Sequence, residues 1–267
     1  MRTPALKKLD GLISDLNTHF ALSNFFAEQF RFSNASLLAD EDRHDELTAT
    51  AFPESHGAKR INIPIGKITT QIEDFETYLL SQSIARCSEG VITYFEWIEA
   101  FSLFAFGRTR DADGDFFASI CRQFATEKKE LLPNECYWTF DHLRKRRNCL
   151  IHNNDESTET FEQNCRQHGT ILNRYWTDRL GHKCRVNYTN KAPSEITPDA
   201  FIDLINCIRL ATESFDVMYC QKIPDQKRKD YTLEQFESKF KNEKLSKDRK
   251  AKKINGFSQW LFGVNYS

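Results

Sequence analysis

The sequence contains no apolar run that approaches the roughly 18 to 20 residues a helix needs to cross a membrane. The N-terminal stretch, MRTPALKKLDGLISDL, carries basic residues but lacks the apolar core of a secretory signal. Internal repeats and low-complexity tracts are absent, apart from a charged stretch near the C-terminus. We therefore expect a cytoplasmic protein that does not associate with a membrane.

Several signatures of common enzyme chemistry are also missing. The chain has no glycine-rich phosphate-binding loop, no clustered carboxylates suited to Mg²⁺ and no GxSxG nucleophile elbow. The 8 cysteines include no CxxC pair and occur singly within helical patterns. We interpret them as reduced thiols that pack as small hydrophobic side chains. The sequence thus predicts no cofactor and no bound metal.

The composition favours a folded core with an uneven distribution of charge. Hydrophobic residues make up 40% of the 267 residues, and 22 of them are Phe. The net charge is −1, yet residues 222–253 contain 12 Lys and Arg against 6 Asp and Glu. A basic tail of this kind suits a polyanionic partner such as nucleic acid, but a solvated tail without a partner fits the composition at least as well.

Apolar residues recur at helical spacing along most of the chain. The stretch Thr197-Pro198-Asp199 is typical of a helix start, because it has a hydroxyl at the N-cap, a proline at N1 and an acid in the first turn. The stretch HKCRVNYT alternates enough to predict a short strand, and residues 39–60 are expected to form a loop. Helices are predicted over 5–32, 69–106, 116–129, 134–153 and 158–181, and from Thr197 onward.

These elements predict an all-α protein. Its helical bundle would span residues 67–222. An N-terminal segment of helix and loop would occupy 1–66, and a basic extension would occupy 223–267. The last residues, INGFSQWLFGVNYS, are apolar again and are expected to dock on the rest of the protein.

The candidate site lies in DHLRKRRNCLIHNN, residues 141–154. Position 147 falls within the apolar stripe of the predicted helix but holds an arginine. Charged side chains are rarely buried unless they are paired, so Arg147 either has a partner on that face or marks a site. The other positions of this stripe are Cys136, Phe140, Leu143, Leu150 and Ile151.

A polar stripe runs beside the apolar one and contains Tyr137, Asp141, Arg144, Asn148 and His152. An imidazole can transfer a proton near neutral pH, and a guanidinium fork suits a phosphate. Metal-independent cleavage of RNA, with the ribose 2′-hydroxyl as nucleophile, needs only such groups. Arg147 and His152 lie about 140° apart on an ideal helix, so they converge only if the helix ends or bends before His152, or if a second copy supplies the other half.

The stretch from Arg147 to His152 resembles the R-x4-6-H motif of the HEPN superfamily, in the form of Arg, a polar residue, three more residues and His. Many HEPN proteins are all-α, metal-independent endoribonucleases of toxin, abortive-infection and CRISPR-linked systems. In such proteins the motif lies at a homodimer interface, where two copies form one cleft. The resemblance therefore implies an endoribonuclease that acts on RNA as a homodimer, under a possible antitoxin or regulatory partner.

The resemblance also implies roles for individual residues. His152 would act as the acid or base, Arg147 would contact the phosphate, and Asn148 would be the polar residue after the arginine. Asp141 resembles the upstream acid of a related ribonuclease domain. The neighbouring residues Arg144, Arg146 and Tyr137 are expected to contact the substrate.

The sequence differs from one group of HEPN toxins at a position that is used to control them. HEPN toxins paired with nucleotidyltransferase antitoxins often carry a tyrosine two residues after the histidine, and Asn154 occupies that position here. Control by attachment of AMP at this position is therefore not expected.

Three alternatives remain open from the sequence. Arg147 could pair with Asp141 or with an acid from another helix and only hold the bundle together. The protein could be a non-catalytic module or adaptor that binds nucleotide or RNA through the same basic residues. Zinc could instead use two Cys-x2-His pairs, Cys149 with His152 and Cys165 with His168, and it would then compete for His152.

Overall fold

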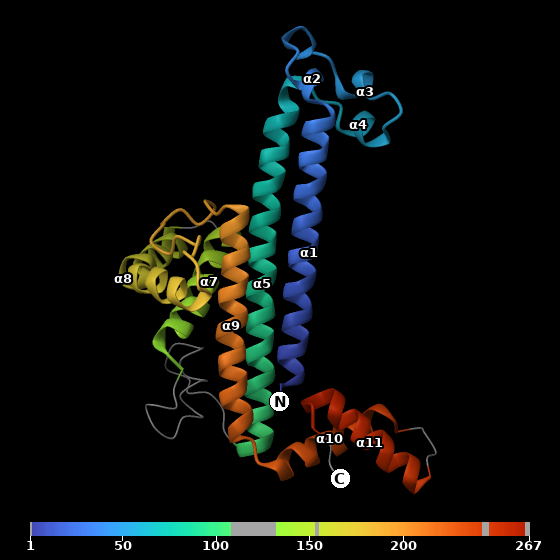
Figure 1. The fold of residues 1–267 in the computed structure, drawn as a ribbon, viewed down its shortest axis with the longest axis vertical. Coiled ribbons are helices and arrows are strands. Elements are labelled where there is room, and N and C mark those ends of the chain that lie inside the picture. Colours follow the sequence, from blue (N-terminus) through green and yellow to red (C-terminus); the bar gives the residue numbers. More distant parts are fainter. Residues whose placement is uncertain (1, 108–131, 153–154, 242–245, 265–267) are drawn as a thin grey trace. The chain divides into compact units, whose positions relative to one another are not determined.

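A computed structural model describes residues 2–107, 132–152, 155–241 and 246–264. These ranges are all-α, with ten α-helices, two short 3-10 helices and no strand (Figure 1). None of the helices in these ranges is long and apolar enough to cross a membrane. By its contacts the chain divides into two compact units, Met1–Ile13 with Arg86–Ser267 (unit 1) and Ser14–Ala85 (unit 2).

The structure confirms five of the predicted helices, and the helix predicted over 116–129 lies outside the described residues. Thr197 caps the last of the five as expected, because its hydroxyl accepts a hydrogen bond from the amide of Ala200 over 3.2 Å. The five helices are α1 (Pro4–Ser33), α5 (Ile68–Phe106), α7 (Asn134–His152), α8 (Asp155–Leu180) and α9 (Pro198–Lys222).

Two local predictions were wrong. Residues 182–189 form irregular backbone rather than a strand, and their groups bond to helices instead of to a neighbouring strand. The amide of Tyr188, for example, donates to the side chain of Asn173 over 2.9 Å. The expected loop over 39–60 contains the short helices η1 (Glu41–Arg43), α3 (Thr48–Ala51) and α4 (His56–Ile61).

The core of unit 1 forms where α5, α7 and α9 meet (Figure 1). Phe95 of α5 is fully buried, and its ring centroid lies 5.2 Å from that of Phe140 on α7 and 5.1 Å from that of Phe215 on α9. Such tilted and edge-on aromatic pairs are favourable beyond the area they bury. This single ring therefore joins three helices.

The start of α1 is fastened to the same core through Asp216 of α9. The carboxylate of Asp216 accepts hydrogen bonds from the amide and hydroxyl of Thr3 and, over 3.1 Å, from the hydroxyl of Tyr94. Burial raises the pKa of this carboxyl above its usual range, while these donors act in the opposite direction. A buried carboxylate with several donors ties α1, α5 and α9 together.

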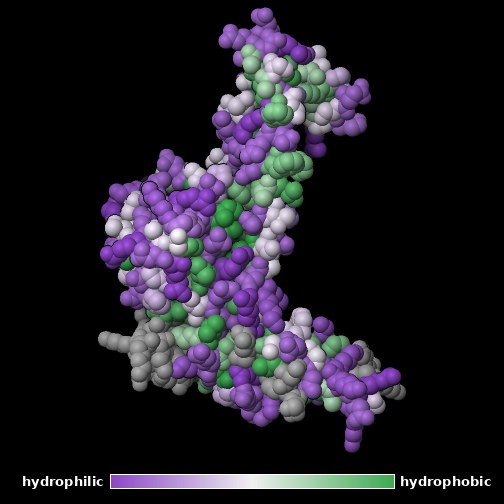
Figure 2. Space-filling view, in the orientation of Figure 1, coloured by the Kyte–Doolittle hydropathy of each residue, from purple (hydrophilic) through white to green (hydrophobic). Residues whose placement is uncertain are grey.

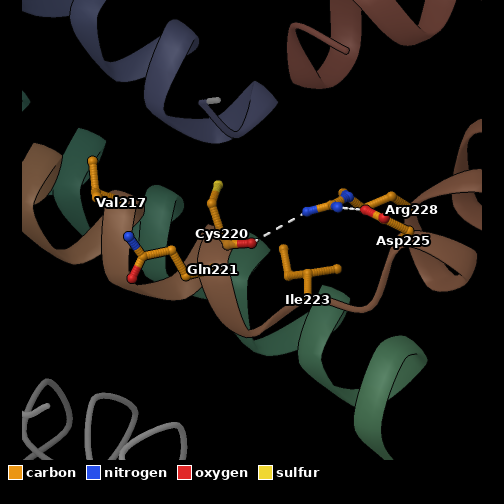
Figure 3. A pocket seen from close by; sticks show the side chains of 6 residues that line it. All are labelled: Val217, Cys220, Gln221, Ile223, Asp225 and Arg228. Atoms are coloured by element: carbon orange, nitrogen blue, oxygen red, sulfur yellow. Dashed lines mark hydrogen bonds and ion pairs between the residues drawn. The ribbon is translucent and has the colours of Figure 1, made fainter. Parts of the chain in front are cut away.

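The end of α9 is closed by an arginine from α10 (Asp225–Lys239). Arg228 donates to the backbone carbonyl of Cys220 over 3.3 Å and pairs with Asp225 (Figure 3). This bond satisfies one of the terminal carbonyls that have no partner within the helix. A hollow of about 540 Å³ lies here, and because its charged groups already serve the helix end we assign it a structural role. It is lined by Val217, Cys220, Gln221, Ile223, Asp225 and Arg228.

The final helix of the described residues, α11 (Lys247–Phe262), packs on α10. Its last residue, Phe262, is fully buried, with its ring 5.9 Å from Phe101 and 6.0 Å from Tyr231. The predicted docking of the apolar C-terminal residues is confirmed at Leu261 and Phe262, which are both buried.

Unit 2 contains the remaining parts of α1 and α5 and the short helices between them. Arg31 of α1 pairs with Glu76 of α5 over 3.1 Å, and Thr48 bonds through its hydroxyl to the carbonyl of Ala58 over 2.9 Å. Several large apolar side chains of this unit remain exposed, and hydrophobic surface is visible over its helices (Figure 2). They are Leu22, Phe25, Phe26, Phe32, Leu47, Ile61, Phe75 and Tyr78.

Seven cysteines fall within the described ranges, and all seven are free and buried. Burial raises the pKa of Cys87 and of Cys220 to about 12 and that of Cys165 to about 11. The prediction that the cysteines pack as small hydrophobic side chains is therefore confirmed for these residues.

Close packing of α8 against the irregular segment after it depends on Gly169. A Cβ at this position would lie 2.6 Å from the carbonyl oxygen of Tyr188. Gly169→Ala is therefore expected to lower the free energy of unfolding by about 1–3 kcal/mol, although alanine is the better helix former. Urea denaturation measures the change.

The matched control is Gly11→Ala in α1, where a Cβ would meet no atom within 4 Å. There the substitution is expected to raise the free energy of unfolding by about 0.5–1 kcal/mol, because glycine is unfavourable within a helix. Equal stabilisation at both positions would show that the segment after α8 does not approach Gly169 as closely as the structure has it.

Candidate active site

Helix α7 carries all the predicted site residues, and it is buried on more than one side. It packs against α8 and also against α9. Its buried residues therefore cover a wider arc than a single stripe: Cys136, Tyr137, Thr139, Phe140, Asp141, His142, Leu143, Arg146 and Cys149.

The buried arginine of this helix is Arg146, whereas the sequence predicted Arg147. Arg146 is only 2% exposed, and its guanidinium lies over the ring of Phe161 at 5.4 Å from the centroid. The side chain of Arg147 is 23% exposed, and Ile151, which the apolar stripe had placed inside, is exposed. The predicted stripe is thus confirmed at Cys136, Phe140 and Leu143, which are buried, and is wrong at Arg147 and Ile151. The buried surface of α7 extends instead to residues that contact α8.

Arg147 has an acidic partner on another helix. Its Nη2 lies 2.5 Å from Oε1 of Glu89 on α5, and its Nη1 donates to the side-chain oxygen of Asn148 over 3.1 Å. This ion pair is expected if Arg147 only stabilises the packing of the helical bundle. However, the Glu89 side chain is 53% exposed, and ion pairs open to solvent contribute only about 0–1 kcal/mol.

His152 lies in the last turn of α7 and is exposed to solvent. The helix continues unbroken to this residue, so the bend that would bring His152 toward Arg147 within one chain is absent from α7. The separation of five residues then places the two side chains on different sides of the helix. Arg147 and His152 could therefore share one site only if a second copy of the chain supplied one of the two residues.

Asp141 is engaged by neighbouring groups. Its carboxylate lies 2.6 Å from Arg144 and 2.7 Å from Lys145, and it accepts a hydrogen bond from Asn164 of α8 over 3.2 Å. These contacts orient the two cations along the helix surface, and they compensate the negative charge of Asp141. Asp141 thus connects α7 with Asn164 of α8.

A second histidine, His142, belongs to neither of the two stripes predicted for this helix. It is fully buried between Phe161 and Tyr188, and its Nδ1 lies 3.2 Å from the side-chain oxygen of Asn164. Burial, reinforced by the charge of Arg146, holds the pKa of His142 well below its usual range. The imidazole is therefore neutral at pH 7 and inaccessible to an RNA substrate.

The predicted substrate contacts differ in accessibility. Arg144 is partly exposed, while Tyr137 and Arg146 are buried in α7. Of these three side chains, Arg144 is therefore the one that solvent reaches.

No family model, curated protein or solved structure matches this chain. What the site can do therefore follows from the chemistry of its own side chains.

The four residues of the zinc alternative are not brought together. Cys149 and Cys165 pack in one apolar cluster, but His168 stacks on Trp138 at 4.2 Å between centroids and His152 is exposed at the end of α7. Within the described ranges no three His, Cys, Asp or Glu side chains are placed to hold a metal ion. The geometry thus gives no support to the zinc alternative.

Proposed function

We propose that the protein is a metal-independent endoribonuclease with a HEPN-like helical bundle, acting in the cytoplasm as a toxin or antiviral defence effector. The observation that carries this proposal is the end of α7, where an exposed imidazole, His152, lies four residues after Asn148, the hydrogen-bond partner of Arg147. Because Arg147 and His152 face different sides of this helix, the proposal requires a second copy of the chain to complete the site. An accessible base and a guanidinium are the groups that cleavage by the 2′-hydroxyl requires.

In the proposed reaction His152 removes the proton of the ribose 2′-hydroxyl. The oxygen attacks the adjacent phosphorus, the bond to the 5′-oxygen breaks, and the products end in a 2′,3′-cyclic phosphate and a 5′-hydroxyl. The leaving oxygen needs a proton, which the histidine of a second copy would supply. Arg147 would stabilise the charge on the pentavalent phosphorus, as guanidinium groups do for phosphoryl oxygens.

Glu89 gives this proposal a specific requirement. Arg147 must leave Glu89 to contact phosphate. Because the ion pair is open to solvent, breaking it costs little free energy. The proposed partners are RNA, a second copy of the chain and a possible antitoxin or regulatory protein.

The Arg147–Glu89 pair supplies the test. Arg147→Ala is expected to lower RNA cleavage roughly a hundredfold or more, because it removes the group that stabilises the transition state. Glu89→Gln is expected to raise cleavage at low RNA concentration, because it releases Arg147 from its competing carboxylate. Initial rates on a fluorescently labelled RNA measure both changes.

Arg166→Ala is the matched control, since Arg166 forms an exposed pair with Glu162 over 2.9 Å on α8. It should leave cleavage unchanged. If Arg147→Ala also leaves cleavage unchanged, Arg147 belongs to the bundle and the proposed role of the arginine is wrong.

The same ion pair favours a second candidate, a non-catalytic module that binds RNA or nucleotide through the basic surface of α7. In that case Arg147 would serve only the packing of α7 on α5. Binding would weaken steeply with salt and no product would form. Analysis of the RNA by gel after prolonged incubation separates the two candidates.

A further inference from the structure

A second basic surface lies away from α7, in the hairpin of α10 and α11. It surrounds a hollow of about 680 Å³. We call it the C-terminal hollow, and it is lined by Lys239, Phe240, Arg249, Lys252, Lys253, Gly256, Phe257 and Trp260. Its lining consists almost entirely of aromatic rings and cations, a combination that neither core packing nor a solvated helix requires.

The rings of the C-terminal hollow form a continuous row. Phe240 and Phe257 lie 6.0 Å apart between centroids, and Phe257 stacks on Trp260 at 5.5 Å with an angle of 22° between the ring planes. The row ends at Trp260, which is 58% exposed. An exposed ring of this size offers an apolar surface on which a planar group can stack.

The cations lie against these same rings. The ammonium of Lys239 is 5.1 Å from the centroid of Trp260, and that of Lys253 is 4.3 Å from the centroid of Phe240. Lys239, Arg249 and Lys252 form no ion pair within the described part of the chain. Their positive charge is therefore available to an anion that approaches the ring row.

The rest of α11 indicates which kind of polyanion fits. A helix that lies on a membrane inserts a broad apolar face. In α11, Leu261 and Phe262 are buried within unit 1, so the apolar side chains it leaves at the C-terminal hollow are the rings of Phe257 and Trp260. The surface that α11 presents in Figure 2 is mostly hydrophilic. Stacking rings with unpaired cations suit nucleobases joined by phosphates better than they suit lipid.

We propose that the C-terminal hollow binds single-stranded nucleic acid, with a base stacked on Trp260 and the flanking phosphates held by Arg249 and Lys252. Unpaired bases are needed because the face of a paired base is covered by its neighbours in the duplex. The proposal does not depend on cleavage at His152, and it holds equally for an RNA-binding module.

The test measures binding of the full chain to a fluorescein-labelled oligodeoxythymidylate of about 15 nucleotides by fluorescence anisotropy. This probe lacks the 2′-hydroxyl, so the proposed nuclease chemistry cannot degrade it. Trp260→Ala is expected to weaken binding roughly 5- to 150-fold, and Trp260→Phe, which keeps a ring, to weaken it less. Because Trp260 is exposed, its replacement should leave the fold intact, and circular dichroism of the variants tests this.

The salt dependence of binding tests the cations. Lys252→Ala should reduce the slope of log K against log salt by about 0.7. Lys250→Ala is the control on the same helix, because Lys250 points to Glu237, 3.4 Å away, and does not line the C-terminal hollow. The slope of log K against log salt should change less in Lys250→Ala than in Lys252→Ala.

Three results would overturn the proposal. The first is absence of oligonucleotide binding, including the case in which phosphatidylserine-containing vesicles bind instead. The second is binding of duplex DNA as tightly as the single strand. The third is single-strand binding that Trp260→Ala leaves unaltered.

Discussion

Replacing His152 with alanine is expected to reduce RNA cleavage roughly 10²- to 10⁴-fold, which is the range for removal of a general acid or base. The side chain is exposed at the end of α7, so its loss should leave the fold intact. If two copies share one cleft, the variant lacks both imidazoles and the effect lies toward the upper end of the range. Gel analysis of a labelled RNA, with circular dichroism as the check of folding, measures the result.

The control is His56→Ala, which removes another exposed histidine, at the start of α4. It should cleave as the wild type does, and EDTA should affect neither protein. Full activity in the His152 variant would refute the proposed chemistry. Cleavage that EDTA abolishes would point instead to a metal-dependent nuclease.

Phe95→Ala is expected to have the largest effect on stability, about 3–5 kcal/mol in the free energy of unfolding. The ring is fully buried and contacts Phe140 and Phe215, so its removal leaves a cavity where three helices meet. All 4 tryptophans lie within unit 1, so tryptophan fluorescence during urea denaturation follows the unit that contains Phe95.

Leu103→Ala on the same helix provides the comparison, because Leu103 is exposed. Its effect should stay within about 0.5 kcal/mol of zero. Similar losses at both positions would mean that the α5–α7–α9 junction is not the stabilising core that the structure indicates.

The sequence predicted the long helices well where local signals were strong. Thr197 and Pro198 mark the start of α9 because a capping hydroxyl and a proline at N1 act within a few residues of one another. The strand predicted over 182–189 failed for the opposite reason. A strand needs a neighbour to pair with, and the described ranges provide only helices.

The candidate site was predicted less completely. Periodicity along one helix assumes a single buried face, whereas α7 contacts α5, α8 and α9. For this reason the sequence predicted Arg147 as the buried arginine, although the structure buries Arg146. The partner of Arg147 lies 58 residues earlier in the chain, on α5, and no local pattern in either segment signals that contact. His142 was missed because its burial depends on α8 and the segment after it.

The shielded thiols give this protein a set of internal probes. Because the seven cysteines of the described ranges are buried, iodoacetamide can react with each only when its surroundings open. Cys136 and Cys149 would then report on the opening of α7, and Cys207 and Cys220 on that of α9. Mass spectrometry of the alkylated peptides would thus rank the local stability of the helices without any substitution in the sequence.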